Sequence, residues 1–77
     1  MAIKGDAELV REAMDSQHQR YPNIELEIVD SVVTPVSTGG WLVFVVYSFD
    51  FPDLGRRTRW IVRPLRSGAA SGASGEV

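Results

Sequence analysis

The chain has 77 residues, with ten acidic and eight basic side chains, a net charge of −2 and no cysteine. This length allows one small domain, and the absence of cysteine excludes disulfides and thiolate metal sites. The single histidine also argues against a structural zinc site. A domain of this size gains only about 3–5 kcal/mol from one core. With disulfides and metal sites excluded, association with a second subunit is the remaining way to stabilise it.

The amino-terminal residues, MAIKGDAEL, lack the apolar core of a signal peptide. The longest apolar run, WLVFVVY, is far shorter than the roughly 20 residues that a membrane-spanning helix needs. We therefore expect a cytoplasmic protein with no membrane partner.

The first predicted element is a helix over Asp6–Tyr21. Asp6 can cap its N-terminus, acidic residues lie in the first turn, and Arg20 in the last turn suits the helix dipole. Pro22 disfavours the α conformation at the preceding residue, so the helix should end there. One stripe recurs at spacings of three and four and should face the core: Leu9, Val10, Ala13, Met14, Gln17 and Tyr21.

The next predicted element is a strand over residues 23–33. Apolar and acidic residues alternate in its first half, which is typical of a half-buried strand: Ile24, Glu25, Leu26, Glu27 and Ile28. Parity directs the three apolar side chains toward the helix and the two glutamates outward. The alternation breaks at residues 29–31, which either a β-bulge or fraying toward Pro35 would explain.

Two further strands follow, over Trp41–Asp50 and Arg56–Arg63. The first is preceded by a turn at VSTGG (residues 36–40), and the two are joined by a turn that contains Pro52, Asp53 and Gly55. Because the connections are short, sequence neighbours should pair as an antiparallel meander. Residues 1–66 are thus predicted to form one α+β domain, a helix packed on a three-stranded antiparallel meander (α-β-β-β).

The carboxyl-terminal stretch, Ser67–Val77, contains only serine, glycine, alanine, one glutamate and one valine. Such a segment buries too little apolar surface to offset the entropy lost on ordering. It is predicted to be a disordered tail.

The strand over Trp41–Asp50 is apolar on both faces for most of its length, so the helix can cover only half of its apolar side chains. Its larger set is assigned to the helix: Trp41, Val43, Val45, Tyr47 and Phe49. The outer face then has Leu42, Phe44 and Val46 at its centre, unless a bulge exchanges the two faces. On the strand over Arg56–Arg63, we expect Trp60 and Val62 to point inward and Arg57, Arg59 and Arg63 to point outward.

These assignments lead to the hypothesis of a non-enzymatic protein-interaction module, a homodimer formed through the outer sheet face. An apolar centre would lie between an acidic flank, Glu25 and Glu27, and a basic flank, Arg57, Arg59 and Arg63. A two-fold axis would set each acidic flank against the partner's basic flank, which would fix the register.

Three alternatives remain open. The same face could bind another protein, as an inhibitor or regulatory subunit does. The Arg56–Arg66 segment could bind nucleic acid, although the negative net charge and an inward Trp60 weigh against it. An interior lined by Tyr47, Phe49 and Phe51 could carry a small ligand.

No catalytic, metal-binding or cofactor-binding residue is predicted. His18 has no cysteine partner and no Ser-His-acid motif around it. Glu25 and Glu27 alone make an incomplete acid/base or cation site. The Gly39-Gly40 pair precedes a strand rather than a helix, so it does not form a phosphate-binding loop.

Overall fold

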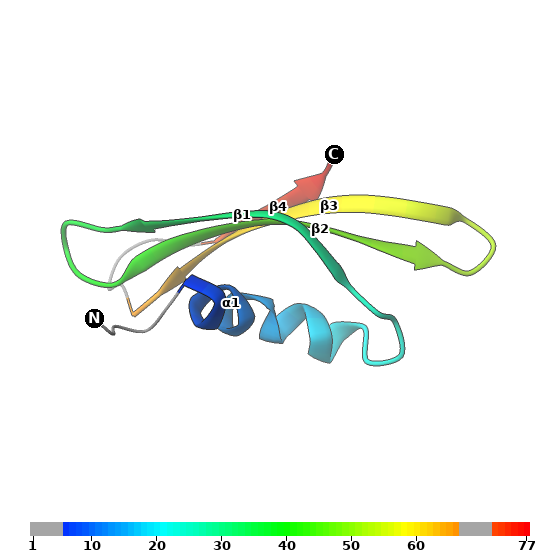
Figure 1. Cartoon of the computed structure of the whole chain (residues 1–77), viewed down its shortest axis with the longest axis horizontal. Coiled ribbons are helices and arrows are strands. Elements are labelled where there is room, and N and C mark those ends of the chain that lie inside the picture. Colours follow the sequence, from blue (N-terminus) through cyan, green and yellow to red (C-terminus); the bar gives the residue numbers. More distant parts are fainter. Residues whose placement is uncertain (1–5, 67–71) are drawn as a thin grey trace.

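The computed structural model describes residues 6–66 and 72–77, in which one helix lies across one face of an antiparallel sheet (Figure 1). The sheet has the order β1-β2-β3-β4, and each strand pairs with its neighbour in sequence. The predicted α+β class and meander are confirmed, with four strands rather than three. The elements are α1 (Asp6–Arg20), β1 (Glu27–Pro35), β2 (Trp41–Phe51), β3 (Gly55–Leu65) and β4 (Ala73–Glu76).

The helix α1 has the predicted boundaries to within one residue, and it buries the predicted stripe. After the helix ends, the Tyr21 amide still donates to the Gln17 carbonyl at 2.9 Å, and the Tyr21 ring stacks on Phe49 with centroids 5.7 Å apart. The helix thereby continues its packing for one residue beyond its regular hydrogen bonding. Its buried residues are Leu9, Val10, Ala13, Met14 and Gln17.

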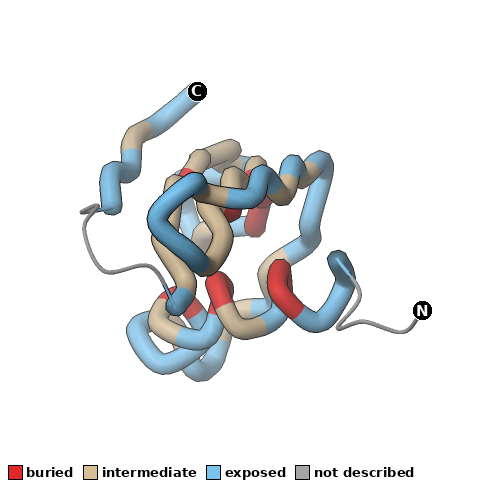
Figure 2. The backbone as a smooth tube through the Cα atoms, turned by 90° about the vertical axis from the view of Figure 1, so that its left-hand side faces the viewer, coloured by how far each residue is buried: buried red, intermediate tan, exposed pale blue. Residues whose placement is uncertain are grey.

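The hydrophobic core lies where α1 meets the central strand β2, and its buried residues are red in Figure 2. The helix-facing set predicted for this strand is confirmed. β3 contributes a single buried residue to the core, Ile61. The buried core residues of β2 are Val43, Val45, Tyr47 and Phe49, and Trp41 packs against them.

The strand β1 begins at Glu27, four residues later than predicted, and it contains the irregularity that the sequence suggests. Its pairing with β2 shifts register between Ile28 and Asp30, so Val29 is an extra residue in the ladder. This is the β-bulge that was one of the two explanations. Ile28 pairs with Tyr47 on the helix side, as expected, but it is 46% exposed.

The face assignment predicted for β3 is wrong, because the register of the β2–β3 hairpin gives the residues of β3 the opposite parity. Phe51 pairs with Gly55 across a three-residue loop, and Val45 consequently pairs with Ile61. Paired residues share a face of the sheet, so Ile61 turns toward the helix. The loop uses positive φ at Asp53 (69°) and Gly55 (82°), and loop geometry of this kind sets hairpin register.

The observed register places Arg57, Arg59 and Arg63 on the helix side, whereas Trp60, Val62 and Pro64 lie on the other side. Arg63 donates to the Ser16 hydroxyl on α1, and Arg59 donates to the Tyr21 hydroxyl at 3.4 Å. Arginine can occupy this side because its aliphatic stem covers apolar surface while its guanidinium reaches the edge. Trp60 and Val62 point away from the helix, opposite to the prediction.

The prediction of a disordered tail over 67–77 is wrong for residues 73–76, which form β4; residues 67–71 lie outside the described residues. The β4 strand pairs with β3 from Arg59↔Glu76 to Val62↔Ala73. The prediction considered only apolar burial. The free edge of β3 offers backbone hydrogen-bond partners, which require no apolar side chain.

The turn before β2 contains two glycines whose backbone conformations can be tested by substitution. Gly39 and Gly40 have φ of 106° and 79°, and a Cβ at Gly40 would lie 2.4 Å from backbone atoms of Leu65 and Arg66, whereas a Cβ at Gly39 meets nothing within 4 Å. Gly39→Ala should cost about 1–2 kcal/mol through its φ alone. Gly40→Ala should cost about 1–3 kcal/mol more through overlap. Urea unfolding of the two variants measures the difference, and equal losses would contradict this account.

Candidate interaction surface of the sheet

The side of the sheet opposite α1 carries an apolar surface that draws residues from all four strands. Alternation and pairing place these side chains together, since Phe44 of β2 lies between Val32 and Val62 on the neighbouring strands. In Figure 1, α1 lies on the other side, and no described element covers this one. We call this surface the outer apolar face; it consists of Val32, Leu42, Phe44, Val46, Trp60, Val62, Pro64 and Ala73.

Two aromatic side chains lie near the centre of the outer apolar face. The Phe44 and Trp60 rings are tilted by 34°, with centroids 6.3 Å apart. Val32 beside Phe44 is 52% exposed, a high value for a β-branched side chain. The predicted centre, Leu42, Phe44 and Val46, therefore does lie on the outer side.

Trp60 is a member of this face that alternation within β3 did not predict. The signal that could have found it is the length of the β2–β3 loop, since a three-residue loop at 52–54 determines the parity of every residue in β3.

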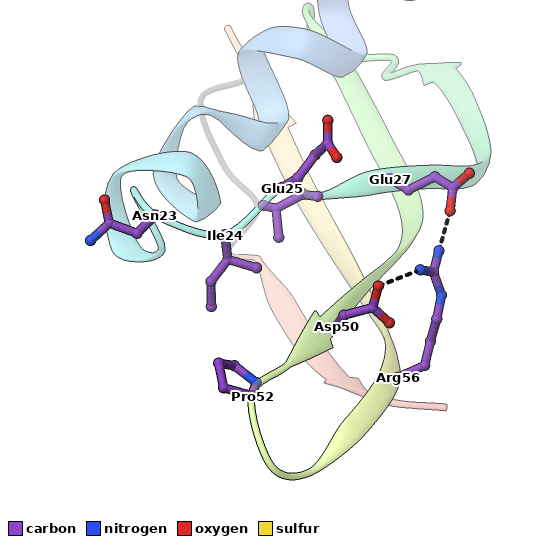
Figure 3. Close-up of a pocket in the computed structure, with 8 residues that line it drawn as sticks. Asn23, Ile24, Glu25, Glu27, Asp50, Pro52 and Arg56 are labelled. Carbon is purple, nitrogen blue, oxygen red and sulfur yellow. Dashed lines mark hydrogen bonds and ion pairs between the residues drawn. The ribbon is translucent and has the colours of Figure 1, made fainter.

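A polar cluster closes one end of the outer face. Arg56 donates to the Ser48 hydroxyl at 2.8 Å and to Asp50 Oδ2 at 3.2 Å, and it forms an ion pair with Glu27. The Arg56 side chain covers Ser48, which is only 3% exposed. Figure 3 shows Arg56 between the two carboxylates. With two carboxylates and one guanidinium, the cluster has a net charge of −1.

The two predicted acidic residues have different positions. Glu27 lies in β1 and belongs to the polar cluster. Glu25 precedes the strand and lines an adjacent groove of about 500 Å³ together with Asn23 and Pro52 (Figure 3). Only Glu27 is therefore part of the sheet's outer side.

The predicted basic flank does not exist on the outer face. Arg57, Arg59 and Arg63 share the helix side with Ile61, because they have its parity. There, Glu76 of β4 lies within 4.0 Å of Arg57 and 3.9 Å of Arg59. Interlocking acidic and basic flanks can no longer set the register of a dimer.

The corrected geometry also bears on the nucleic-acid alternative. Trp60 and the pair Arg57 and Arg59 are still on opposite faces, as expected, although the sides are exchanged. Arg56 contacts Glu27 and Asp50, and Arg66 donates to both carboxylate oxygens of Glu12 at 2.9 Å. The arginines and the tryptophan therefore do not form one stacking platform.

The aromatic residues considered for a small ligand pack against one another. The Tyr47 and Phe49 rings are stacked with centroids 6.0 Å apart, and Phe51 meets Phe49 edge-on at 5.5 Å. Tyr47 and Phe49 are also buried beneath α1. Their contacts are those of core packing.

Comparison of the chain with known protein families, curated proteins and solved structures finds no match. Among residues 6–66 and 72–77, no three acidic or histidine side chains are grouped so as to hold a metal ion. In the same described part of the chain, no helix is both long and apolar enough to cross a membrane.

Ionisation of Tyr47 makes the stability of the fold depend on pH. Burial raises the pKa of its hydroxyl, and the nearby Arg59 opposes that shift; the hydroxyl donates to Gln17 Oε1 at 3.3 Å. Because the folded state favours the neutral phenol, its contribution to stability is complete below about pH 10 and declines as the pH rises above it. Tyr47→Phe should flatten the decline in unfolding free energy above about pH 10, measured by urea titration. An unchanged slope would contradict this assignment.

Proposed function

We propose that the protein is a non-enzymatic interaction module that forms a homodimer through the outer apolar face. The observation that carries the proposal is the Phe44–Trp60 centre with aliphatic residues around it, on a side of the sheet that no described element covers. Exposed apolar surfaces of this kind mark interaction sites in soluble proteins. A cytoplasmic location stays a prediction.

The size of the face suits a dimer. The molecule extends 43 Å along its longest axis, which the strands follow, and 19 Å along the viewing direction of Figure 1, in which the sheet is seen edge-on. A rectangle of these two extents has an area on the order of 800 Å², which is an upper bound for the outer side and about what each partner buries in a standard interface. Aromatic residues at the centre of such an interface contribute a large share of the affinity.

A second copy suits the chemistry of the face. Its centre is apolar, so two copies can stack as a β-sandwich without complementary charges, with the sheets roughly 10 Å apart. The Glu27–Arg56–Asp50 cluster lies at one end only. A two-fold axis perpendicular to the strands separates the two clusters, each with a charge of −1, whereas an axis parallel to the strands brings them together. Like-charge repulsion favours the perpendicular axis.

The test compares two apolar-to-acid substitutions. Phe44→Glu places a charge at the centre of the proposed interface and should convert the dimer to a monomer, with at least a hundredfold loss of affinity. Leu54→Glu is the matched control, because Leu54 lies in the β2–β3 loop and is 59% exposed, away from the outer face. Leu54→Glu should leave the dimer intact. Sedimentation equilibrium over a range of concentrations measures both.

A wild-type chain that stays strictly monomeric at tens of micromolar would overturn the homodimer. A dimer that survives Phe44→Glu would also overturn it, since the interface would then lie elsewhere. Circular dichroism of each variant shows whether the fold is retained.

A further inference from the structure

Among the described elements, β4 pairs with β3 and with no other strand. The helix α1 packs against β1, β2 and β3, whereas its backbone does not come close to β4. The sequence of β4, Ala-Ser-Gly-Glu, contains no β-branched or aromatic residue, and only Gly75 within it is not exposed. Such a strand has low intrinsic preference for a sheet and opens at small free-energy cost.

The edge of β3 nevertheless restricts which residues a strand paired with it can have. On the outer side, the Trp60 ring lies against Gly75, and a Cβ at that position would come within 2.8 Å of three ring atoms. On the helix side, Arg57 and Arg59 lie near the Glu76 carboxylate. Glycine followed by an acidic residue therefore fits these two positions best.

At the helix-side position of the edge, Glu76 pairs only partly with the neighbouring arginines. Its Oε2 atom is 3.9 Å from Arg59 Nε, which is beyond hydrogen-bond distance, and this buried Nε has no hydrogen-bond partner among the described residues. A buried donor without a partner destabilises the folded state. An occupant whose carboxylate comes closer to Arg59 would recover part of this free energy.

We infer that the β3 edge is a second binding site, which adjoins the outer apolar face, and that it accepts an extended acidic peptide in place of β4. The peptide adds a strand to the sheet through backbone hydrogen bonds. It has glycine facing Trp60 and an acidic residue next, facing Arg57 and Arg59. It has an apolar residue at the position of Ala73, which pairs with Val62 within the outer apolar face.

The chain's own carboxyl-terminal segment competes with this peptide. Because β4 belongs to the same chain as β3, its effective concentration at the edge is in the millimolar range. A partner must therefore bind more tightly than β4 does. A β-branched residue in place of Ala73 is one source of that advantage, since it raises strand preference and packs against Val62.

The experiment uses the full chain and a fluorescent peptide with the sequence of residues 71–77 carrying Ala73→Val. The acceptor is compared with a tail-release variant, Gly72→Val with Gly75→Val. A Cβ at Gly72 would lie 2.7 Å from the Val62 carbonyl oxygen, so this variant cannot dock its own tail without displacing β3. Thermal unfolding and circular dichroism confirm that its helix and core remain folded.

Fluorescence anisotropy should show at least tenfold tighter peptide binding to the tail-release variant than to the wild-type chain. The same peptide with Glu76→Gln should bind at least threefold more weakly, and this difference should shrink in 1 M salt because the ion pair is screened. The same peptide with Gly75→Val should not bind, because its side chain meets the Trp60 ring.

Two results would overturn the inference. The first is a folded tail-release variant that binds no peptide, or that binds the Gly75→Val peptide equally well. The second is a wild-type dimer that the tail-release substitutions abolish and Phe44→Glu preserves, which would assign the edge to a second copy's carboxyl-terminal strand.

Discussion

The arrangement of the molecule depends on β2, the central strand, which carries apolar side chains on both of its faces. One helix can cover only one face, and α1 covers the side with Val43, Val45, Tyr47 and Phe49. Phe44 and its neighbours on the other face remain without a covering layer among the described residues. Burial of apolar surface is the dominant favourable contribution to both folding and association, so the same constraint that forms the core also creates the candidate interface.

The β2–β3 hairpin determines what the uncovered face contains. Its three-residue loop pairs Val45 with Ile61, which sends Trp60 outward and three arginines toward the helix. The outer face is consequently more aromatic and less basic than alternation within β3 alone indicates. A sandwich of two such faces needs no interlocking charges, and the polar cluster around Arg56 affects only its orientation.

The two edges of the sheet differ in how they are protected. β1 has a bulge at Val29, which disrupts the ladder and discourages further pairing. The β3 edge is instead occupied by β4, whose residues contribute little beyond the Gly75–Trp60 and Glu76–arginine contacts. An edge covered by a weak strand is protected against indiscriminate pairing, yet it can accept a segment with a better fit.

The sequence by itself determined the helix, its buried stripe, the strands β1 to β3 and the two-sided apolar character of β2, because these depend on local periodicity. It also indicated the bulge in β1, where the alternation breaks. Tertiary structure decided the orientation of β3 and the presence of β4. The orientation of Trp60 and Arg59 depends on loop geometry at Asp53 and Gly55, and β4 depends on backbone partners that only a folded edge provides. The hydrophobic pattern of β3 does not encode the register that the preceding loop sets. The pattern of β4 does not encode the sheet edge with which it pairs.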